Sequence, residues 1–556
     1  MKGAYSIKST TSRPSIYRSG SSHLGLEIEN AQYYDEEKQP IQTLHRGLKS
    51  RMVQLLAIGG CIGTGLFIGS GGALSLAGPG SLFLSYVFMS FIIWAVMNMM
   101  AEMVTFLPLP GYGPQYFCGE YVSSSIGFAI SWIYYYSFSI LVATEVTAGA
   151  ILINYWPNSV PTAVWITILL GVSVFLNITS VKFFGESEFY FAFIKVIAIV
   201  GLIILGIVLF FGGGPNHDRL GFRYWKDGMA FKSYLVDGKT GQFLGFWYAV
   251  IRSGYAFICS PELITIAAGE AEHPRKNIPK AANRFIYRLA FFYIFGTLVI
   301  GVICNSNSQR LLNGSDDASA SPFVIGIQNA SIPILNHIIN GAILTSAASS
   351  GNAFLYTASR VLYSNAKQGI APAIFKKTNR FGVPYFAVSA TGLFGCLAYL
   401  NSSSSSADVF NWLSNLSTIS GFLAWITVGF AYLRWRKAIV FHGLSERVTY
   451  RTPFQPYTTY AVIFFVSLIC ITNGFSVFFH FNGPDFVAAY ITFPILVALY
   501  VGHMIYEKVK FGRFQWLRPI EDIDLLTGLD LIEQEESEYV PQVPRNIFER
   551  IWFWIC

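Results

Sequence analysis

Long apolar stretches alternate with short polar segments along most of this chain. Each apolar stretch reaches about 20 residues, the length that an α-helix needs to cross the hydrocarbon core of a bilayer. The pattern therefore predicts an all-α polytopic membrane protein with about twelve transmembrane helices. We number these predicted spans in chain order, and their ranges are 53–76, 81–104, 126–155, 162–180, 188–212, 242–267, 285–305, 333–364, 382–401, 408–434, 459–480 and 485–506.

Polar segments flank the spans at both ends. Residues 1–50 are predicted to be an N-terminal tail, 51–506 the transmembrane domain and 507–556 a C-terminal tail. The first tail lacks the short apolar region of a cleavable signal peptide, so span 1 is expected to act as its own insertion signal.

Lysine and arginine gather beside the span ends on one side of the predicted topology: before span 1, between spans 6 and 7, 8 and 9, and 10 and 11, and after span 12. Such residues mark cytoplasmic loops, so both termini are expected in the cytoplasm. The HPRK motif at 273–276 is expected to set this orientation, and Glu102 to pair with a basic loop residue. The opposite side contains a sequon at Asn313, a candidate glycosylation site.

Two spans contain residues that interrupt a helix. Span 1 has the sequence GTG at 63–65, and span 6 has Ser260 followed by Pro261. Each interior glycine costs roughly 0.5–1 kcal/mol relative to alanine, and proline removes a backbone donor and clashes with the preceding turn. Interruptions at matching places in spans 1 and 6 fit two inverted repeats of five spans followed by two further spans, the architecture of a transporter.

Broken helices expose backbone groups at membrane depth, which is tolerated only around a polar cavity. The N-terminus of a half-helix suits a carboxylate, and exposed carbonyl groups suit an ammonium. The two breaks can thus hold both ends of a zwitterion. The alternative is that the glycines serve close packing between helices.

Three segments carry a resemblance to a known family: GGCIGTGLFIGSG in span 1, GESEFYFAFIKVIAIVG in span 5, and ELITIAAGEAEHPRKNIPKA after the span 6 break. They resemble the fungal amino-acid permeases of the amino acid–polyamine–organocation superfamily, which share the LeuT-type fold. Two further segments, SPFVIGIQNASIPILNHIINGAILTSA and SADVFNWLSNLSTISGFLAW, are most similar to the proline permease subgroup. The resemblance implies proton-coupled amino-acid uptake through the plasma membrane, with the proton gradient in place of a cofactor.

The two breaks and the resemblance together indicate the substrate-binding residues. They are Ile62, Gly63, Thr64, Gly65, Glu145, Tyr255, Ala256, Cys259, Ser260 and Ala348. Proline permeases usually have a large aromatic residue where this chain has Ala348. A roomier site is therefore expected, open to proline, to larger neutral amino acids or to 4-aminobutyrate, because a pocket rejects one additional methylene only weakly.

Ionisable residues inside spans are expensive and are functional candidates by default. Glu145 in span 3 is expected either to contact substrate or to have a structural role. Lys195 in span 5 falls where LeuT-type sodium symporters build a cation site, so the resemblance implies that it replaces sodium and takes part in proton coupling. The alternative is a fixed charge that tethers span 5 to span 1.

Glu262 follows the span 6 break and is expected to take part in proton coupling or substrate binding, or else to cap the second half-helix. Arg252, on the outer half of span 6, is expected to attract a substrate carboxylate from outside or to extend to the interface.

Composition narrows the classes of function that remain open. Only 12% of the residues are charged, and the net charge of +7 is ordinary for basic cytoplasmic loops, so no nucleic acid is expected. The seven cysteines show no CxxC spacing, so neither a metal site nor a disulfide framework is expected. No hydrolytic or redox motif points to an enzyme.

Cys556 ends the chain beside aromatic residues and is a candidate for palmitoylation, with an unmodified thiol as the alternative. The resemblance implies that ubiquitin-ligase machinery acts on the tails. We expect a monomer in the lipid bilayer that binds an amino acid, with a nutrient-sensing transceptor as the alternative class.

Overall fold

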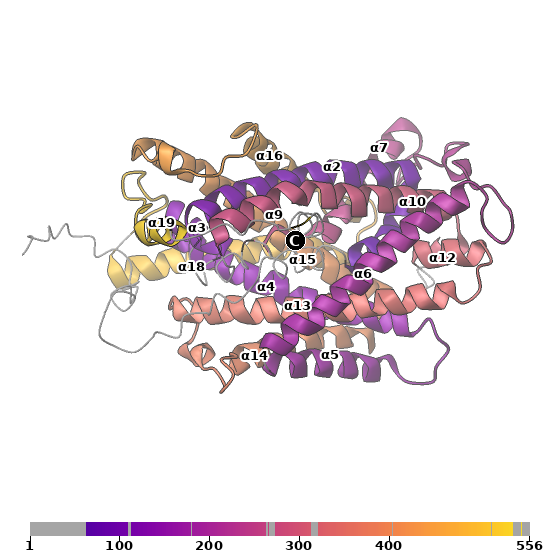
Figure 1. The fold of residues 1–556 in the computed structure, drawn as a ribbon, viewed down its shortest axis with the longest axis horizontal. Coiled ribbons are helices and arrows are strands. Elements are labelled where there is room, and N and C mark those ends of the chain that lie inside the picture. Colours follow the sequence, from indigo (N-terminus) through magenta and orange to yellow (C-terminus); the bar gives the residue numbers. More distant parts are fainter. Residues whose placement is uncertain are drawn as a thin grey trace, which may run out of the picture. The chain divides into compact units, whose positions relative to one another are not determined.

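The computed structural model describes residues 63–108, 113–179, 181–258, 260–262, 265, 273–312, 321–402, 404–512, 514–537 and 546. All of them belong to one compact unit, 42–556. Every regular element among these residues is helical (Figure 1). The elements are η2 (Gly65–Gly69), α2 (Ser70–Phe106), α3 (Pro114–Tyr121), α4 (Ser124–Ile153), α5 (Thr162–Ile178), α6 (Val181–Phe210), η3 (Arg223–Trp225), α7 (Gly238–Phe257), α9 (Pro274–Leu289), η4 (Ala290–Ile294), α10 (Phe295–Ile303), α11 (Gln309–Leu312), α12 (Pro322–Asn329), α13 (Leu335–Lys367), η6 (Ala373–Lys376), α14 (Tyr385–Gly395), η7 (Cys396–Ser402), α15 (Ser406–Phe441), η8 (Ser445–Arg447), α16 (Tyr457–Thr472), η9 (Phe475–Phe478), α17 (Gly483–Tyr490), α18 (Thr492–Phe511) and α19 (Leu529–Ser537).

Each predicted span coincides with helix in the described residues. Among the described residues, six helices are long and apolar enough to cross a membrane, and the bent pair α17 and α18 makes a seventh. Two shorter apolar helices, Thr162–Ile178 and Tyr385–Asn401, match spans 4 and 9. The all-helical membrane protein expected from the hydrophobic pattern is confirmed. The pattern did not predict the short helices α3, α12 and α19, because their apolar stretches are too brief to signal a span.

Spans 1 and 2 are joined without a loop. The segment Gly65–Phe106 is helical throughout except at Gly78, whose φ of 84° divides it in two. A side chain at Gly78 would meet the backbone oxygen of Met229 at 2.4 Å, so glycine is required there both for its conformation and for this close approach. The amide of Gly80 donates to the Ala230 carbonyl oxygen at 2.8 Å. The turn between the two spans is therefore held by the segment that precedes α7.

The span 6 break lies slightly before its predicted position. Helix α7 ends at Phe257, Ile258 is extended with φ −60° and ψ 143°, and residues 260–262 are helical again. Pro261 therefore belongs to the first turn of the second half-helix, where its missing amide hydrogen costs nothing because that donor has no intrahelical partner. The interruption itself is confirmed, but its position at Ser260 and Pro261 was wrong by about two residues.

Helices distant in sequence pack in two groups. Helix α2 packs along α7 and also contacts α9 and α10, whereas α4 packs against both α13 and α15 (Figure 1). Helix α6 contacts α10 of the first group and α13 of the second. The segments at 63–65 and 257–262 belong to the first group, and they meet side chains of α4, α13 and α15 from the second.

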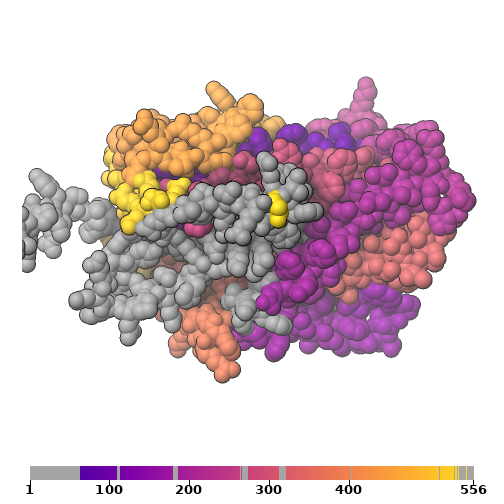
Figure 2. All heavy atoms as spheres, viewed as in Figure 1, coloured from indigo at the N-terminus to yellow at the C-terminus, as the bar shows by residue number. Residues whose placement is uncertain are grey.

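Residues 514–537, which fall in the predicted C-terminal tail, are packed against the helices. In Figure 2 the yellow residues near the C-terminal end lie beside the orange surface of the α15–α16 region. Ile523, Leu525 and Leu529 are buried. The first half of this tail is therefore a structural part of the molecule.

Candidate functional site

Glu145 is the centre of a polar cluster at the span 1 break. The Thr64 hydroxyl donates to Glu145 Oε1 at 2.9 Å, and the Tyr255 hydroxyl donates to the same oxygen at 3.2 Å. The two hydroxyl groups are themselves 3.1 Å apart. Glu145 Oε2 is buried and has no hydrogen-bond partner among the described residues. The cluster joins spans 1, 3 and 6, as expected, and leaves one carboxylate oxygen free to accept a donor.

Gly63 lies beside this cluster and beside Lys195. A Cβ at Gly63 would meet only Glu145 Oε1 and Ser350 Oγ, each at 3.7 Å, so its backbone borders side chains without tight packing. Lys195 Nζ donates to Ser350 Oγ at 3.1 Å and is almost fully buried, with 1% exposure. The ammonium on span 5 therefore lies where spans 5 and 8 meet next to span 1.

Gly65 has a different environment. A Cβ there would lie 2.5 Å from Ala256 Cα, a separation that real Cβ atoms do not show. Gly65 therefore lets the two broken helices touch backbone to backbone, which is the small-residue packing raised as the alternative for this segment. Ala256 is the other half of this contact. For both residues, substrate binding stays a prediction.

Two tyrosine hydroxyls donate hydrogen bonds to backbone carbonyl groups beside the helix interruptions. Tyr86 donates to the Gly65 carbonyl oxygen at 3.4 Å, and Tyr293 donates to the Ala256 carbonyl oxygen at 2.7 Å. Their rings stack with centroids 6.1 Å apart, and Phe257 lies 4.3 Å from Tyr293. Backbone groups freed by a broken helix need such partners at membrane depth.

Glu262 belongs to a second polar cluster. Its Oε1 accepts hydrogen bonds from Trp425 Nε1 at 2.5 Å and from the Tyr134 hydroxyl at 3.4 Å. Tyr134 precedes Glu145 by about three turns of α4, or roughly 16 Å. The two carboxylates are therefore separated along span 3.

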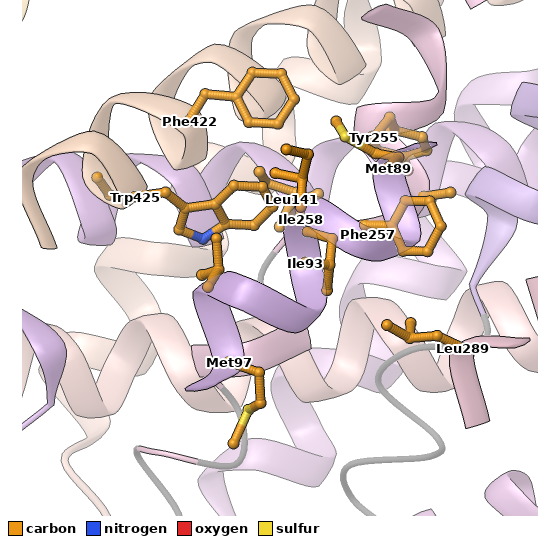
Figure 3. Close-up of a cluster of buried hydrophobic side chains, with 14 of the residues drawn as sticks. Met89, Ile93, Met97, Leu141, Tyr255, Phe257, Ile258, Leu289, Phe422 and Trp425 are labelled. Atoms are coloured by element: carbon orange, nitrogen blue, oxygen red, sulfur yellow. The ribbon is translucent and has the colours of Figure 1, made fainter. Parts of the chain in front are cut away.

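Apolar side chains fill the space between the two clusters. Figure 3 places Leu141 and Ile258 between Trp425 and Tyr255. Both are buried in the same hydrophobic cluster. Ile258 lies so close to Gly421 of α15 that a Cβ there would meet its Cδ1 at 2.3 Å. Ile258, the extended residue of the span 6 break, thus belongs to the apolar layer that separates Glu145 from Glu262.

Arg252 bonds side chains of α15. It is partly buried and donates to Asn411 Oδ1 and, at 3.4 Å, to Asn415 Oδ1, both on α15. Its hydrogen-bond partners are neutral, so the guanidinium keeps its charge available to an anion. Attraction of a substrate carboxylate stays a prediction.

Glu102 was expected to pair with a basic loop residue, and within the described residues its partners are neutral. Its carboxylate accepts from the Tyr432 hydroxyl at 2.6 Å and from the Thr452 backbone amide at 2.6 Å. A backbone amide and a hydroxyl thus already satisfy this buried carboxylate.

Ala348 is not on the same face of α13 as the residues that border Gly63. A Cβ at Gly351 would lie 3.3 Å from Glu145 Cβ, and Ser350 faces Gly63. At about 100° per residue, Ala348 is rotated roughly 160° from Ser350 and roughly 60° from Gly351. The geometry therefore separates Ala348 from the Gly63 face, although its role in substrate selection stays a prediction.

Four predicted positions, Ile62, Cys259, Asn313 and Cys556, lie outside the described residues. Ser260 is described, and its buried hydroxyl has no hydrogen-bond partner among the described residues. Within those residues, no group of three potential metal ligands occurs.

Sequence reasoning did not predict the hydrogen-bond partners of two candidates. These are Tyr134 and Trp425, which donate to Glu262, and Ser350, which accepts from Lys195. It also missed the buried carboxylate of Glu188. A signal for Glu188 was present, because an ionisable residue in a span is a candidate by default, but the predicted start of span 5 at 188 placed it at the membrane surface. The partners of Glu262 and Lys195 come from spans far away in sequence, and no local pattern indicates them.

Two broken helices that meet buried carboxylates and an ammonium inside a helical membrane protein define a transporter of small polar solutes. Residues 52–515 match the family described as Amino acid permease. The chain belongs to this family, as the resemblance implied.

Curated relatives cover most of the chain. The probable proline-specific permease of Schizosaccharomyces pombe is 60% identical over 504 residues, which are 89% of this chain and 90% of that protein. The proline-specific permease of Emericella nidulans is 53% identical over 516 residues, 92% of this chain and 93% of that protein. The corresponding permease of Saccharomyces cerevisiae is 47% identical over 525 residues, 93% of this chain and 83% of that protein.

Solved structures share the fold at low sequence identity. A manganese transporter of Eremococcus coleocola superposes with a TM-score of 0.53 and 14% identity, covering 86% of this chain and 100% of that one. A variant of the same transporter gives a TM-score of 0.55 at 15% identity, covering 84% of this chain and 96% of that one. The LeuT-type fold that the resemblance implied is confirmed.

Proposed function

We propose that this permease imports proline across the plasma membrane together with protons, and that both of its termini are cytoplasmic. The observation that carries the proton coupling is the Lys195 ammonium, which donates to Ser350 beside Gly63. A protonated lysine where spans 1, 5 and 8 meet leaves no need for a sodium ion there, and its amine is able to release and regain a proton.

In this proposal the substrate amino group approaches Glu145. One carboxylate oxygen is held by Thr64 and Tyr255, and the other has no partner among the described residues. A charge-assisted hydrogen bond from the amino group of proline suits that oxygen. The carboxylate of the substrate lies toward the backbone amides at the start of the half-helix after Gly63, as suits a helix N-terminus.

Proline is favoured over the larger substrates by the relatives. Those that are 47–60% identical carry names of proline-specific permeases. Ala348 lies opposite Ser350 on α13 but only about 60° from Gly351, which approaches Glu145, so the wider range that includes 4-aminobutyrate stays the alternative. A transceptor that senses without transport has no supporting observation in the described residues.

Uptake of radiolabelled proline by permease-deficient yeast expressing the full chain tests the proposal. Uptake should rise as external pH falls, collapse with a protonophore, and remain unchanged when choline replaces sodium. Competition by unlabelled 4-aminobutyrate and by larger neutral amino acids measures the substrate range. Sodium-dependent uptake would refute the role given to Lys195, and strong competition by 4-aminobutyrate would restore the roomier site.

Glu262 is proposed to take part in proton coupling through the second cluster. Glu262→Gln should reach the cell surface but flatten the dependence of uptake on external pH. Trp425→Phe is the matched control, because it removes a donor to Glu262 and keeps the charge. A normal pH profile in Glu262→Gln would leave this carboxylate only a structural role.

A further inference from the structure

Glu188 is a buried carboxylate that the proposed mechanism does not yet use. It lies on α6 with 4% exposure, about two helical turns before Lys195 and therefore on the same face of the helix. Its Oε1 accepts a hydrogen bond from Ser349 Oγ at 2.6 Å. Its Oε2 is buried and has no hydrogen-bond partner among the described residues. A carboxylate in this position is costly unless a positive charge compensates it.

Lys195 supplies that positive charge. The two side chains interact electrostatically, and consecutive residues of α13 hold them: Ser349 bonds Glu188, and Ser350 bonds Lys195. One turn of span 8 thus fixes both ends of a buried charge pair on span 5. Glu145 also interacts electrostatically with Lys195, from the substrate side.

Among the described residues, no other charge around Glu188 replaces Lys195. Helices α5 and α10, which pack on α6, contain no charged or titratable side chain. On α6 itself Glu186 and Tyr190 are exposed, and the side chain of Lys182 lies outside those described. The titratable residues of α13 are His337, Tyr356, Arg360, Tyr363 and Lys367. The nearest of them, Tyr356, is about two turns from Ser349, and Arg360 lies over its ring.

We propose that Glu188 is a positioning residue for proton coupling, which acts by stabilising the protonated form of Lys195. With Glu188 ionised, the ammonium of Lys195 is balanced from one side by Glu188 and from the other by Glu145. When the Lys195 Nζ–H bond breaks, the proton passes to water on the cytoplasmic side and the electron pair stays on nitrogen as a neutral amine. Glu188 then remains as an uncompensated carboxylate, which favours rapid reprotonation of the amine. This inference rests on the proposed proton-coupled uptake.

The test compares the pH dependence of proline uptake, per molecule at the cell surface, among variants of the full chain. Glu188→Gln removes the balancing charge and keeps the shape of the side chain. Half-maximal uptake should therefore move to more acidic external pH by about one unit, the lower end of the effect of removing a nearby opposite charge. Ser349→Ala should produce a smaller shift in the same direction, because the carboxylate loses its hydroxyl donor.

Glu186→Gln is the matched control, since it removes a carboxylate from the same helix at an exposed position and should leave the profile unchanged. If the protonophore has no effect on the wild-type protein, the proposed function fails. If the wild-type protein is proton-coupled but Glu188→Gln only lowers uptake equally at every pH, this inference fails. If Glu188→Gln does not reach the surface, Ser349→Ala decides, and an unshifted profile in that variant overturns the proposal.

Discussion

At the residue scale, two glycines two positions apart in span 1 have different functions. A Cβ at Gly63 would meet its nearest neighbours at 3.7 Å, an ordinary contact, whereas a Cβ at Gly65 would meet Ala256 Cα at 2.5 Å. The sequence presents both as equivalent members of one glycine-rich segment. Only the position of span 6, which is distant in sequence, distinguishes them.

This difference predicts opposite behaviour for two alanine substitutions. Gly65→Ala should force the broken helices apart and lower both the amount of folded protein and its melting temperature in detergent. Gly63→Ala should fold normally, and its effect should be confined to proline uptake. Fluorescence size-exclusion chromatography after heating measures the first effect, and uptake per surface molecule the second. Equal thermal stability of the two variants would contradict the packing role of Gly65.

Thr64 provides a test of the Glu145 cluster. Thr64→Ala removes the 2.9 Å donor from a buried carboxylate, and loss of such a donor costs about 1–3 kcal/mol, so uptake efficiency should fall by roughly 5- to 150-fold. Thr64→Ser retains the hydroxyl group and should stay within about twofold of the wild-type protein. Similar losses in both variants would show that the methyl group, rather than the hydroxyl, matters at this position.

At the scale of elements, hydrophobic length and helix-breaking residues were sufficient to predict the spans and the interruption of span 6. The residues before Gly63, on which the interruption of span 1 depends, lie outside those described. Length and helix-breaking residues were insufficient for Pro261, because proline both interrupts a helix and begins one, and only the backbone shows which applies. They were also insufficient for the polar partners. Trp425 and Ser350 lie in otherwise ordinary spans, and their roles arise from packing between helices far apart in the chain.

The C-terminal segment was predicted to be a tail, yet helix α19 forms ion pairs with two arginines of the helical domain. Arg447 binds Glu533 with two parallel hydrogen bonds, at 2.9 and 2.6 Å, and also reaches Asp530 at 2.7 Å. Arg275, at the start of α9, binds Glu536 at 3.1 Å and donates to the Phe106 carbonyl oxygen. Helix α19 therefore connects α9 with the η8 segment after α15.

Docking of α19 should depend on pH. Hydrogen bonding from Arg447 holds the pKa of Glu533 below its ordinary value. A carboxyl group with a lowered pKa in the docked state stabilises docking above its ordinary pKa, near 4–5, and this contribution is lost as pH falls through the lowered value. Protease cleavage in 514–537, measured in opened membrane vesicles with an acid-active protease, should accelerate in that acidic range.

Substitution of Arg447 tests the same contact at neutral pH. Arg447→Ala should accelerate cleavage by up to about fivefold, because exposed ion pairs contribute at most about 1 kcal/mol. Arg447→Lys retains the charge without the paired hydrogen bonds and should have an intermediate effect. An unchanged cleavage rate in Arg447→Ala would mean that Arg275 and the buried leucines and isoleucines hold the segment without Arg447.

At the scale of the whole molecule, transport requires the two helix groups to move past one another around the site. Hydrogen bonds between the two groups occur at two different positions along α15. Arg252 of α7 binds Asn411 and Asn415 of α15 on the predicted outer side, whereas Glu262 binds Trp425 farther along α15. If α7 moves relative to α15 during each cycle, a covalent link at the outer level should stop transport.

A pair of introduced cysteines tests this motion. Arg252→Cys combined with Asn411→Cys should lose proline uptake when cells are treated with a membrane-impermeant, reducible bifunctional thiol reagent, and a reducing agent should restore it. Each single variant, treated identically, controls for modification of one position and for the native cysteines, including the exposed Cys396. Cross-linking confirmed by mass spectrometry without loss of uptake would mean that α7 and α15 move together, and the moving boundary would then lie between α15 and α4.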